Sequence, residues 1–205
     1  MAATRRGRNL SPLPNWLAAI GILLSVGFGL ANLACGGRSS PEIEPPARII
    51  LFSMDTVRAD LVSGYGTADN TPVLAEIASE GVLFRNSYAA STYTIPSHMS
   101  IFTGLDPIEH AVLDESSMLD PRVPVLAEIL KAAGLRTRAF HEGGYVAARF
   151  GFDRGFDTYS QLKRLAVVED RLESILDWIR SAADDRYFLF LHTYAAHFPY
   201  GGFES

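Results

Sequence analysis

RIILFSM, residues 48–54, is the stretch from which the fold can be read. A short, continuous apolar run of this kind is typical of a β-strand that is buried on both faces of a parallel sheet. Further along, Thr71 and Pro72 predict the start of a helix, and Gly81 predicts its end. The next segment, VLFRNSY at residues 82–88, predicts a second strand.

The same order of signals returns in the second half of the chain. Pro124 predicts the start of a helix that Gly134 ends, and a strand follows around LRTRAF, residues 135–140. An amphipathic pattern over residues 168–179 then leads into RYFLFLH, residues 186–192, which is another buried strand. Alternating strands and helices predict an α/β fold with a mostly parallel sheet flanked by helices.

The N-terminal residues differ from this pattern and indicate an export signal. Three arginines within the first eight residues precede an uncharged apolar stretch, residues 16–34. Cys35, the only cysteine of the chain, follows it within the sequence LACGG. A basic region, an apolar region and small residues, in this order, are typical of a segment that directs export. We therefore predict that residues 1–35 are an export signal.

Three kinds of export signal fit this segment. A lipoprotein signal is favoured, because Cys35 resembles the lipid-accepting cysteine of bacterial lipoproteins. An uncleaved membrane anchor is the second alternative, since about 20 apolar residues span a bilayer, and an ordinary cleaved signal is the third. Each alternative places the remainder outside the cytoplasm, and the first two attach it to a membrane. The proline-containing residues 36–47 are predicted to be a linker.

The charge of the remaining chain argues against one class of partner. The first 40 residues contain four arginines and no acidic residue, which leaves 14 basic against 23 acidic residues in the rest of the chain. Binding to nucleic acid requires a basic surface that neutralises phosphates. We therefore expect no nucleic-acid partner.

Several polar side chains fall where the predicted strands end. Asp55 follows the first strand, His141 follows LRTRAF, and His192 and His197 lie at and beyond the last strand. Ligands of such sheets bind at the carboxyl ends of the strands. These residues are therefore candidates for a functional site.

A further candidate is Thr94 in STYTIPSHMSIFTG, residues 91–104. Pro96 favours the first turn of a helix, so Thr94 is expected near a helix N-terminus, where free N–H groups and the helix dipole attract anions. A hydroxyl at this place is more often only a helix cap. The local sequence alone leaves both roles open.

Five separated segments, taken together, resemble the N-terminal half of the sulfatase family within the alkaline phosphatase superfamily. They are ILFSMDTVRADLVSGYG, NTPVLAEIASEGVLFRNSYA, TIPSHMSIFTGLDPIEHAV, VPVLAEILKAAGLRTRAF and GFDRGFDTY, in this order. The resemblance implies that residues 48–205 are the N-terminal part of a sulfatase-like catalytic domain with an alkaline-phosphatase-like fold. The family's later Asp-His-Gly segment is not found in the sequence. We therefore expect a fold that is incomplete at its C-terminus and a chain that is inactive alone.

The resemblance places Thr94 at the position of the nucleophile. Sulfatases carry a cysteine or serine there, which is converted to formylglycine, and Pro96 matches the proline two residues later. His98 stands where sulfatases have an arginine. A directly acting threonine is used by related phosphodiesterases and phosphoryl-group transferases, and the phosphodiesterases share the Thr-x-Pro-x-His pattern. Thr94 is thus expected to be catalytic, together with His98.

Asp55 matches a carboxylate ligand of the family's metal ion, so the resemblance implies a cation held by Asp55 and Thr94. Met54 stands where sulfatases usually have a second acidic residue. The resemblance leaves calcium, zinc, manganese and magnesium open. Arg58 is equally compatible with an anion contact and with a surface role.

Three further histidines differ in what the resemblance implies. His141 matches the histidine of a Lys-x-His motif, although Ala139 replaces the lysine, and His197 in HFPY matches a histidine that contacts the ester anion. Both are expected to be catalytic. For His192 and His110, a structural role is favoured.

The resulting hypothesis is an exported, metal-dependent hydrolase of sulfate or phosphate esters, with Thr94 as nucleophile. Its substrates would be small-molecule, glycan or lipid esters. One alternative is a phosphodiesterase or phosphoryl-group transferase of the same superfamily. Another is a membrane-tethered inactive relative that serves as a binding module.

Overall fold

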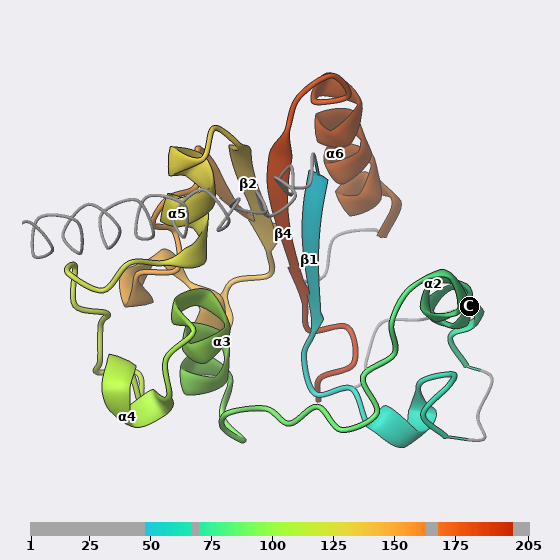
Figure 1. The fold of residues 1–205 in the computed structure, drawn as a ribbon, viewed down its shortest axis with the longest axis horizontal. Helices are drawn as coiled ribbons and strands as arrows, with labels where there is room; N and C mark the ends of the chain where they lie inside the picture. Colours follow the sequence, from blue (N-terminus) through green and yellow to red (C-terminus); the bar gives the residue numbers. More distant parts are fainter. Residues whose placement is uncertain (1–47, 67–69, 163–167, 199–205) are drawn as a thin grey trace, which may run out of the picture. The chain divides into compact units, whose positions relative to one another are not determined.

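A computed structural model of the protein describes residues 48–66, 70–162 and 168–198. Its centre is a parallel four-stranded sheet with the strand order β1-β4-β2-β3 (Figure 1). The predicted α/β fold with a parallel sheet is therefore confirmed. The strands are β1 (Arg48–Met54), β2 (Arg136–His141), β3 (Thr158–Gln161) and β4 (Tyr187–Thr193).

Helices cover both faces of the sheet (Figure 1). On one face, α3 (Thr94–Thr103) and α5 (Leu126–Ala132) pack on Phe188 and Phe190 of β4. On the other face, α6 (Val168–Ser181) packs on the alternate β4 residues Tyr187 and Leu189. Because consecutive strand residues point to opposite faces, β4 needs apolar side chains at each position from Tyr187 to Leu191. The continuous apolar run in the sequence of β4 is explained by this double burial.

Strand β1 differs from the prediction that both of its faces are buried. Its side chains are alternately more and less exposed, and Ile50 and Phe52 remain 52% and 51% exposed. The reason is position, because β1 lies at the edge of the described sheet and pairs with β4 alone. An apolar run in a sequence does not distinguish an edge strand from a central one.

The segment between β1 and α3 also departs from the prediction. Helix α2 (Pro72–Glu80) begins at the predicted proline and ends before Gly81. Residues 82–88, however, form no strand, and Val82, Phe84 and Tyr88 are largely exposed. A strand needs a partner for its backbone groups, and no described strand lies beside this segment. Strand β3, in contrast, was not predicted from the sequence.

The remaining described elements are short. They are the helix α4 (Pro107–His110) and the 3₁₀ turns η1 (Ala59–Leu61), η2 (Gly144–Val146) and η3 (Ala148–Phe150). Within the three described ranges, no helix combines the length and apolar character needed to cross a membrane. The predicted export signal and linker, residues 1–47, lie outside the described residues.

Candidate active site

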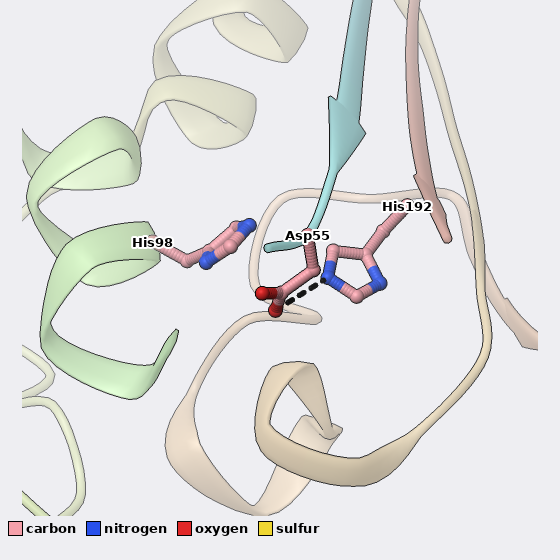
Figure 2. Close-up of side chains that lie close together, drawn as sticks. All are labelled: Asp55, His98 and His192. Carbon is pink, nitrogen blue, oxygen red and sulfur yellow. Dashed lines mark ion pairs between the residues drawn. The ribbon is translucent and has the colours of Figure 1, made fainter. Parts of the chain in front are cut away.

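Three polar side chains from three elements meet at the carboxyl end of the sheet (Figure 2). Asp55 follows β1, His192 lies near the end of β4, and His98 comes from the first half of α3. One potential ligand atom from each residue lies within 4.8 Å of the others, and all three residues are buried. His98 and His192 lie on either side of the Asp55 carboxylate (Figure 2). The predicted location of the site at the strand ends agrees with this arrangement.

The carboxylate of Asp55 is the centre of the cluster. Its Oδ2 atom accepts a hydrogen bond from Thr94 Oγ1 at 3.0 Å and lies 3.6 Å from His192 Nε2. Burial opposes ionisation of Asp55, but the contacts with His192 and Thr94 outweigh it, so the pKa lies below its usual value. Asp55 is therefore a carboxylate at neutral pH and is able to orient the Thr94 hydroxyl.

The backbone holds Asp55 where the strand ends. The Asp55 amide donates to the carbonyl of Thr193 at 3.0 Å, which extends the pairing of β1 with β4 by one bond. Thr56 follows with a φ of 61°, and its hydroxyl donates to the Asp55 carbonyl at 2.7 Å and to the Ala196 carbonyl at 3.2 Å. A positive φ at a β-branched residue costs free energy and is found preferentially at functional sites.

Helix α3 places Thr94 and His98 one turn apart on the same side. The Nδ1 atom of His98 lies 3.0 Å from the carbonyl oxygen of Thr94, and its Nε2 atom lies 2.8 Å from Ser53 Oγ. Burial and the neighbouring His192 lower the pKa of His98, against the opposing effects of the Thr94 carbonyl and Asp55. His98 is therefore neutral at pH 7 and keeps a nitrogen lone pair.

His192 is the residue of the cluster with the least satisfied polar groups. Its side chain is 0% exposed, and neither ring nitrogen has a hydrogen-bond partner among the described residues. The ring packs edge-on against His98 and Tyr194, at centroid distances of 5.0 and 4.5 Å. A buried ring nitrogen without a partner is costly, so its presence indicates a ligand.

The cluster fits the divalent cation that the family resemblance implies. Two imidazole nitrogens and a carboxylate oxygen are common protein ligands of such ions, and neutral histidines are required for binding. Asp55, His98 and His192 supply this donor set, and Thr94 adds a hydroxyl oxygen beside it. The unsatisfied His192 ring is the observation of this structure that supports the fit.

The structure does not bring His141 to this cluster. Its Nδ1 atom accepts a hydrogen bond from the Gly143 amide at 3.0 Å, and its ring packs on Tyr159 at 4.2 Å. Burial and the charge of His192 lower the pKa of His141 to about 4. Ala139 stands where the resemblance places the family's substrate-binding lysine, and its side chain lies in the hydrophobic core.

The other predicted side chains lie around the cluster or away from it. His197 is half-buried, and its ring packs edge-on against Tyr194 at 5.5 Å. His110 is buried, and its Nε2 atom lies 3.2 Å from both Ser100 Oγ and the Pro96 carbonyl. Arg58 forms an exposed ion pair with Asp60.

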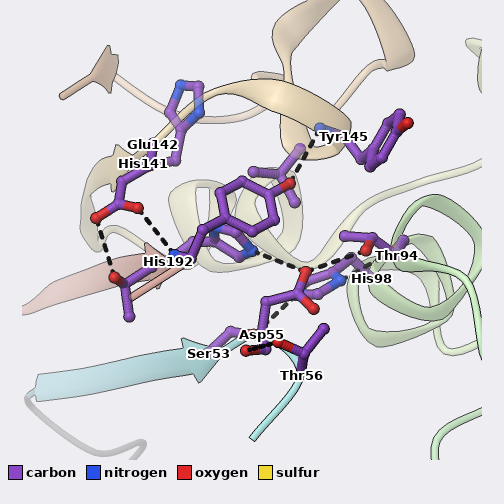
Figure 3. A network of polar contacts seen from close by, with 12 residues as sticks. Ser53, Asp55, Thr56, Thr94, His98, His141, Glu142, Tyr145 and His192 are labelled. Carbon is purple, nitrogen blue, oxygen red and sulfur yellow. Dashed lines mark hydrogen bonds and ion pairs between the residues drawn. The ribbon is translucent and has the colours of Figure 1, made fainter. Parts of the chain in front are cut away.

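Several residues of the site were not singled out from the sequence. Ser53, Glu142 and Tyr194 contact the cluster or its immediate neighbours, as Figure 3 shows for Ser53 and Glu142. Serine in a strand and glutamate after one carry no specific signal. His192 differs from these residues, because its place at the end of a predicted strand makes it a candidate from the sequence, although a structural role is favoured there.

Comparison with known proteins adds three findings. The family model described as Sulfatase matches residues 47–204. N-acetylglucosamine-6-O-sulfatase of Bacteroides thetaiotaomicron is 29% identical over 127 residues, which are 60% of this chain and 23% of that protein. Ectonucleotide pyrophosphatase/phosphodiesterase family member 1 of Homo sapiens is 27% identical over 161 residues, which are 69% of this chain and 17% of that protein.

A solved structure shows the same fold. The phosphonate monoester hydrolase of Agrobacterium radiobacter superposes with a TM-score of 0.62 at 19% identity, covering 77% of this chain and 42% of that one. The chain thus spans less than half the length of each of these three proteins. The expected sulfatase-like fold is confirmed.

Proposed function

Because the chain belongs to the sulfatase family of ester hydrolases, we propose that the protein cleaves sulfate or phosphate esters with Thr94 as the nucleophile and a divalent cation beside it. The observation that carries this proposal is the 3.0 Å hydrogen bond from Thr94 Oγ1 to the buried Asp55 carboxylate. A threonine that only capped the helix would accept a hydrogen bond from a backbone N–H group in the first turn. Thr94 points instead at a carboxylate flanked by two buried histidines.

In the proposed reaction, Thr94 Oγ1 attacks the sulfur or phosphorus atom in line with the leaving alcohol. The hydroxyl proton leaves toward Asp55 Oδ2, the new ester bond forms, and the leaving oxygen departs with the bonding electrons and takes up a proton. His197 is half-buried and packs edge-on against Tyr194, a neighbour of His192, and is the side chain proposed to donate that proton. Water then loses a proton to His197 and attacks the Thr94 ester, and the Thr94 oxygen leaves and takes back the proton from Asp55.

The cation would be held by Asp55, His98 and His192, with the Thr94 oxygen at its side. When bound, it supplies positive charge that lowers the pKa of the Thr94 hydroxyl and stabilises charge on the ester oxygens. The N-terminus of α3 contributes in the same sense, because its first N–H groups carry no side-chain cap at Tyr93 and favour an anion. His98 remains neutral in this role and does not act as an acid.

The substrate class follows from the relatives and is part of the proposal. One relative is named as a sulfatase of a sugar ester, and another is named as a pyrophosphatase and phosphodiesterase. Threonine at the nucleophile position favours phosphate esters, because it lacks the primary alcohol or thiol that is oxidised to formylglycine. A sugar sulfate and a phosphodiester are therefore the two substrates to compare.

Variants of Thr94 in the full-length protein test the nucleophile. Thr94→Ala should lower turnover of 4-nitrophenyl sulfate, 4-nitrophenyl phosphate or bis(4-nitrophenyl) phosphate by about 10⁴-fold or more. Thr94→Ser keeps the hydroxyl and should keep measurable turnover. A chelator should abolish the activity, and added cation should restore it.

Thr103→Ala is the matched control for Thr94→Ala. Thr103 ends the same helix, where its hydroxyl donates to the Met99 carbonyl at 2.8 Å, away from the cluster. This variant should lose stability but keep turnover. Equal turnover of Thr94→Ala and wild type would refute the nucleophile and favour a binding module, for which the buried Ala139 is the supporting feature.

We propose that the protein lies outside the cytoplasm, attached to a membrane through its N-terminal segment, because residues 1–35 combine a basic region, an apolar region and Cys35. Fractionation of cells that express wild type and Cys35→Ala tests this proposal. Cys35→Ala should move a lipoprotein from the membrane to the soluble fraction. An uncleaved anchor would keep the variant in the membrane.

A further inference from the structure

Glu142 is a buried carboxylate that the proposed reaction does not use. It follows the last residue of β2 and is 7% exposed. Its Oε1 atom accepts a hydrogen bond from Thr193 Oγ1 at 2.9 Å, and its Oε2 atom accepts one from the Tyr194 amide at 2.9 Å (Figure 3). Because a buried carboxylate is costly to desolvate, such placement needs a reason beyond packing.

These two bonds lie where the sheet no longer holds β4 from the side of β2. The pairing of β2 with β4 ends at Phe140 and Leu191, one residue before His192. On the other side, the pairing with β1 continues to Met54 and Thr193. Beyond Leu191, the bonds from Thr193 and Tyr194 to Glu142 therefore take the place of backbone hydrogen bonds between β2 and β4, next to His192.

The same bonds connect Glu142 to the rest of the cluster. Thr193 donates its hydroxyl to Glu142 and accepts, at its carbonyl, the Asp55 amide at 3.0 Å. Tyr194 packs its ring on His192 at 4.5 Å, and its hydroxyl accepts a bond from the Tyr145 amide at 3.0 Å. One carboxylate thus restrains the two residues that directly follow His192.

We propose that Glu142 is a positioning residue of this site, which holds the end of β4 so that His192 and Asp55 keep the geometry needed to bind a cation. The inference rests on the proposed function, since a positioning role requires a site to be positioned. Hydrogen bonds that orient metal ligands without touching the metal change metal affinity by about 10- to 100-fold when they are removed. Loss of the Glu142 carboxylate is therefore expected to change the His192 ring geometry and the metal affinity more than the stability of the fold.

The test compares two isosteric variants of the full chain, Glu142→Gln and Glu128→Gln. Glutamine at 142 keeps one acceptor oxygen but replaces the other by an NH₂ group, which cannot accept the second bond. Glu128 is a matched control, because it also receives bonds, from Arg154 at 3.1 and 3.0 Å, but lies in α5 and outside the cluster. The measurements are the ¹⁵N signals of the His192 ring without metal, the dissociation constant for Zn²⁺ as the probe ion, and the melting temperature.

Glu142→Gln should shift or broaden the His192 ring signals and weaken Zn²⁺ binding by about 10- to 100-fold. Glu128→Gln should lower the melting temperature while both site readouts stay at their wild-type values. The proposal is overturned if Glu142→Gln only lowers the melting temperature, or if Glu128→Gln changes the site equally. If wild type binds no Zn²⁺, the cation site of the proposed function fails, and the ring signals alone decide the role of Glu142.

Thr193→Val keeps the test decisive if Glu142→Gln does not fold. It removes the hydroxyl that donates to Glu142 and leaves the Tyr194 bond in place. It also removes an acceptor for the Ala195 amide, but Ala195 is exposed and water replaces that bond. A smaller change of the same two site readouts supports the proposal, and wild-type values for both contradict it.

Discussion

At the scale of single residues, Gly155 is the glycine whose replacement should be most damaging. Its φ is +81°, and a Cβ atom would lie 2.2 Å from the Glu128 amide nitrogen and 2.5 Å from the Ala127 carbonyl carbon. Both are backbone atoms near the start of α5, so neither moves without shifting the helix. Gly155→Ala should therefore lower the free energy of unfolding by about 3 kcal/mol or more, measured by urea denaturation.

Gly104→Ala is the control for that change. Gly104 ends α3 with a φ of +70°, but a Cβ atom there would meet nothing within 4 Å. Gly104→Ala should lower the free energy of unfolding by only about 1–2 kcal/mol, which is the cost of a left-handed backbone conformation at a residue with a Cβ atom. Equal losses for the two variants would contradict a steric clash at Gly155.

Single residues of the site were predictable only where a local pattern marked them. Thr94 and His98 stood in a recognisable helix start, and Asp55 followed an apolar run. For His192 a structural role was favoured, because its neighbours in space are not its neighbours in sequence. It meets Asp55 only because β4, the last described strand, inserts between β1 and β2.

At the scale of elements, Arg154 joins α5 to the loop before it. The guanidinium donates to both carboxylate oxygens of Glu128, and to the carbonyls of Asp120, Pro121 and Val123 at 3.2, 3.1 and 2.8 Å. Lysine carries the same charge but cannot reproduce this planar set of donors. Arg154→Lys should lower the free energy of unfolding by about 1.5–3 kcal/mol, measured by urea denaturation.

Arg122→Lys is the matched control, because Arg122 pairs with Asp120 in the same loop but is highly exposed. It should leave the urea midpoint almost unchanged. A comparable loss in both variants would mean that general charge effects, and not the bond geometry of Arg154, hold the loop.

Helices and strands were predictable where the local sequence carries a specific signal, such as a proline at a helix start or an unbroken apolar run in a buried strand. The starts of α2 and α3 carry proline, and β4 carries an unbroken apolar run. Residues 82–88 look equally strand-like, yet no described strand pairs with them. Strand β3 is short and polar, and its pairing with β2 is a tertiary contact that no local pattern marks.

At the scale of the whole molecule, the three layers follow from alternation of strands and helices, but the strand order does not. The order β1-β4-β2-β3 places β4 at the centre, where both faces are covered, and β1 at the edge of the described sheet. Alternation predicts that strands are parallel, because each crossover helix returns the chain to the same end. It does not state which strand lies beside which, and the composition of the site depends on that choice.

The stability of the cation-free protein should fall as the pH falls from about 6.5 to about 4. Burial and the charge of His192 lower the pKa of His141 to about 4, whereas an unfolded histidine titrates near about 6.5. Between these values the unfolded chain binds a proton that the folded protein excludes. The stabilisation is therefore complete above about pH 6.5 and is lost as the pH approaches 4, by about 3 kcal/mol at most for this residue.

Urea unfolding in the presence of a chelator, from about pH 7.5 to about pH 4.5, measures this loss. Burial also lowers the pKa values of His98 and His110, so several histidines contribute with the same sign. His141→Gln keeps an acceptor for the Gly143 amide but has no titrating group, and should flatten the curve without removing its slope. A slope identical to that of wild type would mean that His141 binds its proton equally in the folded and unfolded states, and would contradict the lowered pKa of His141.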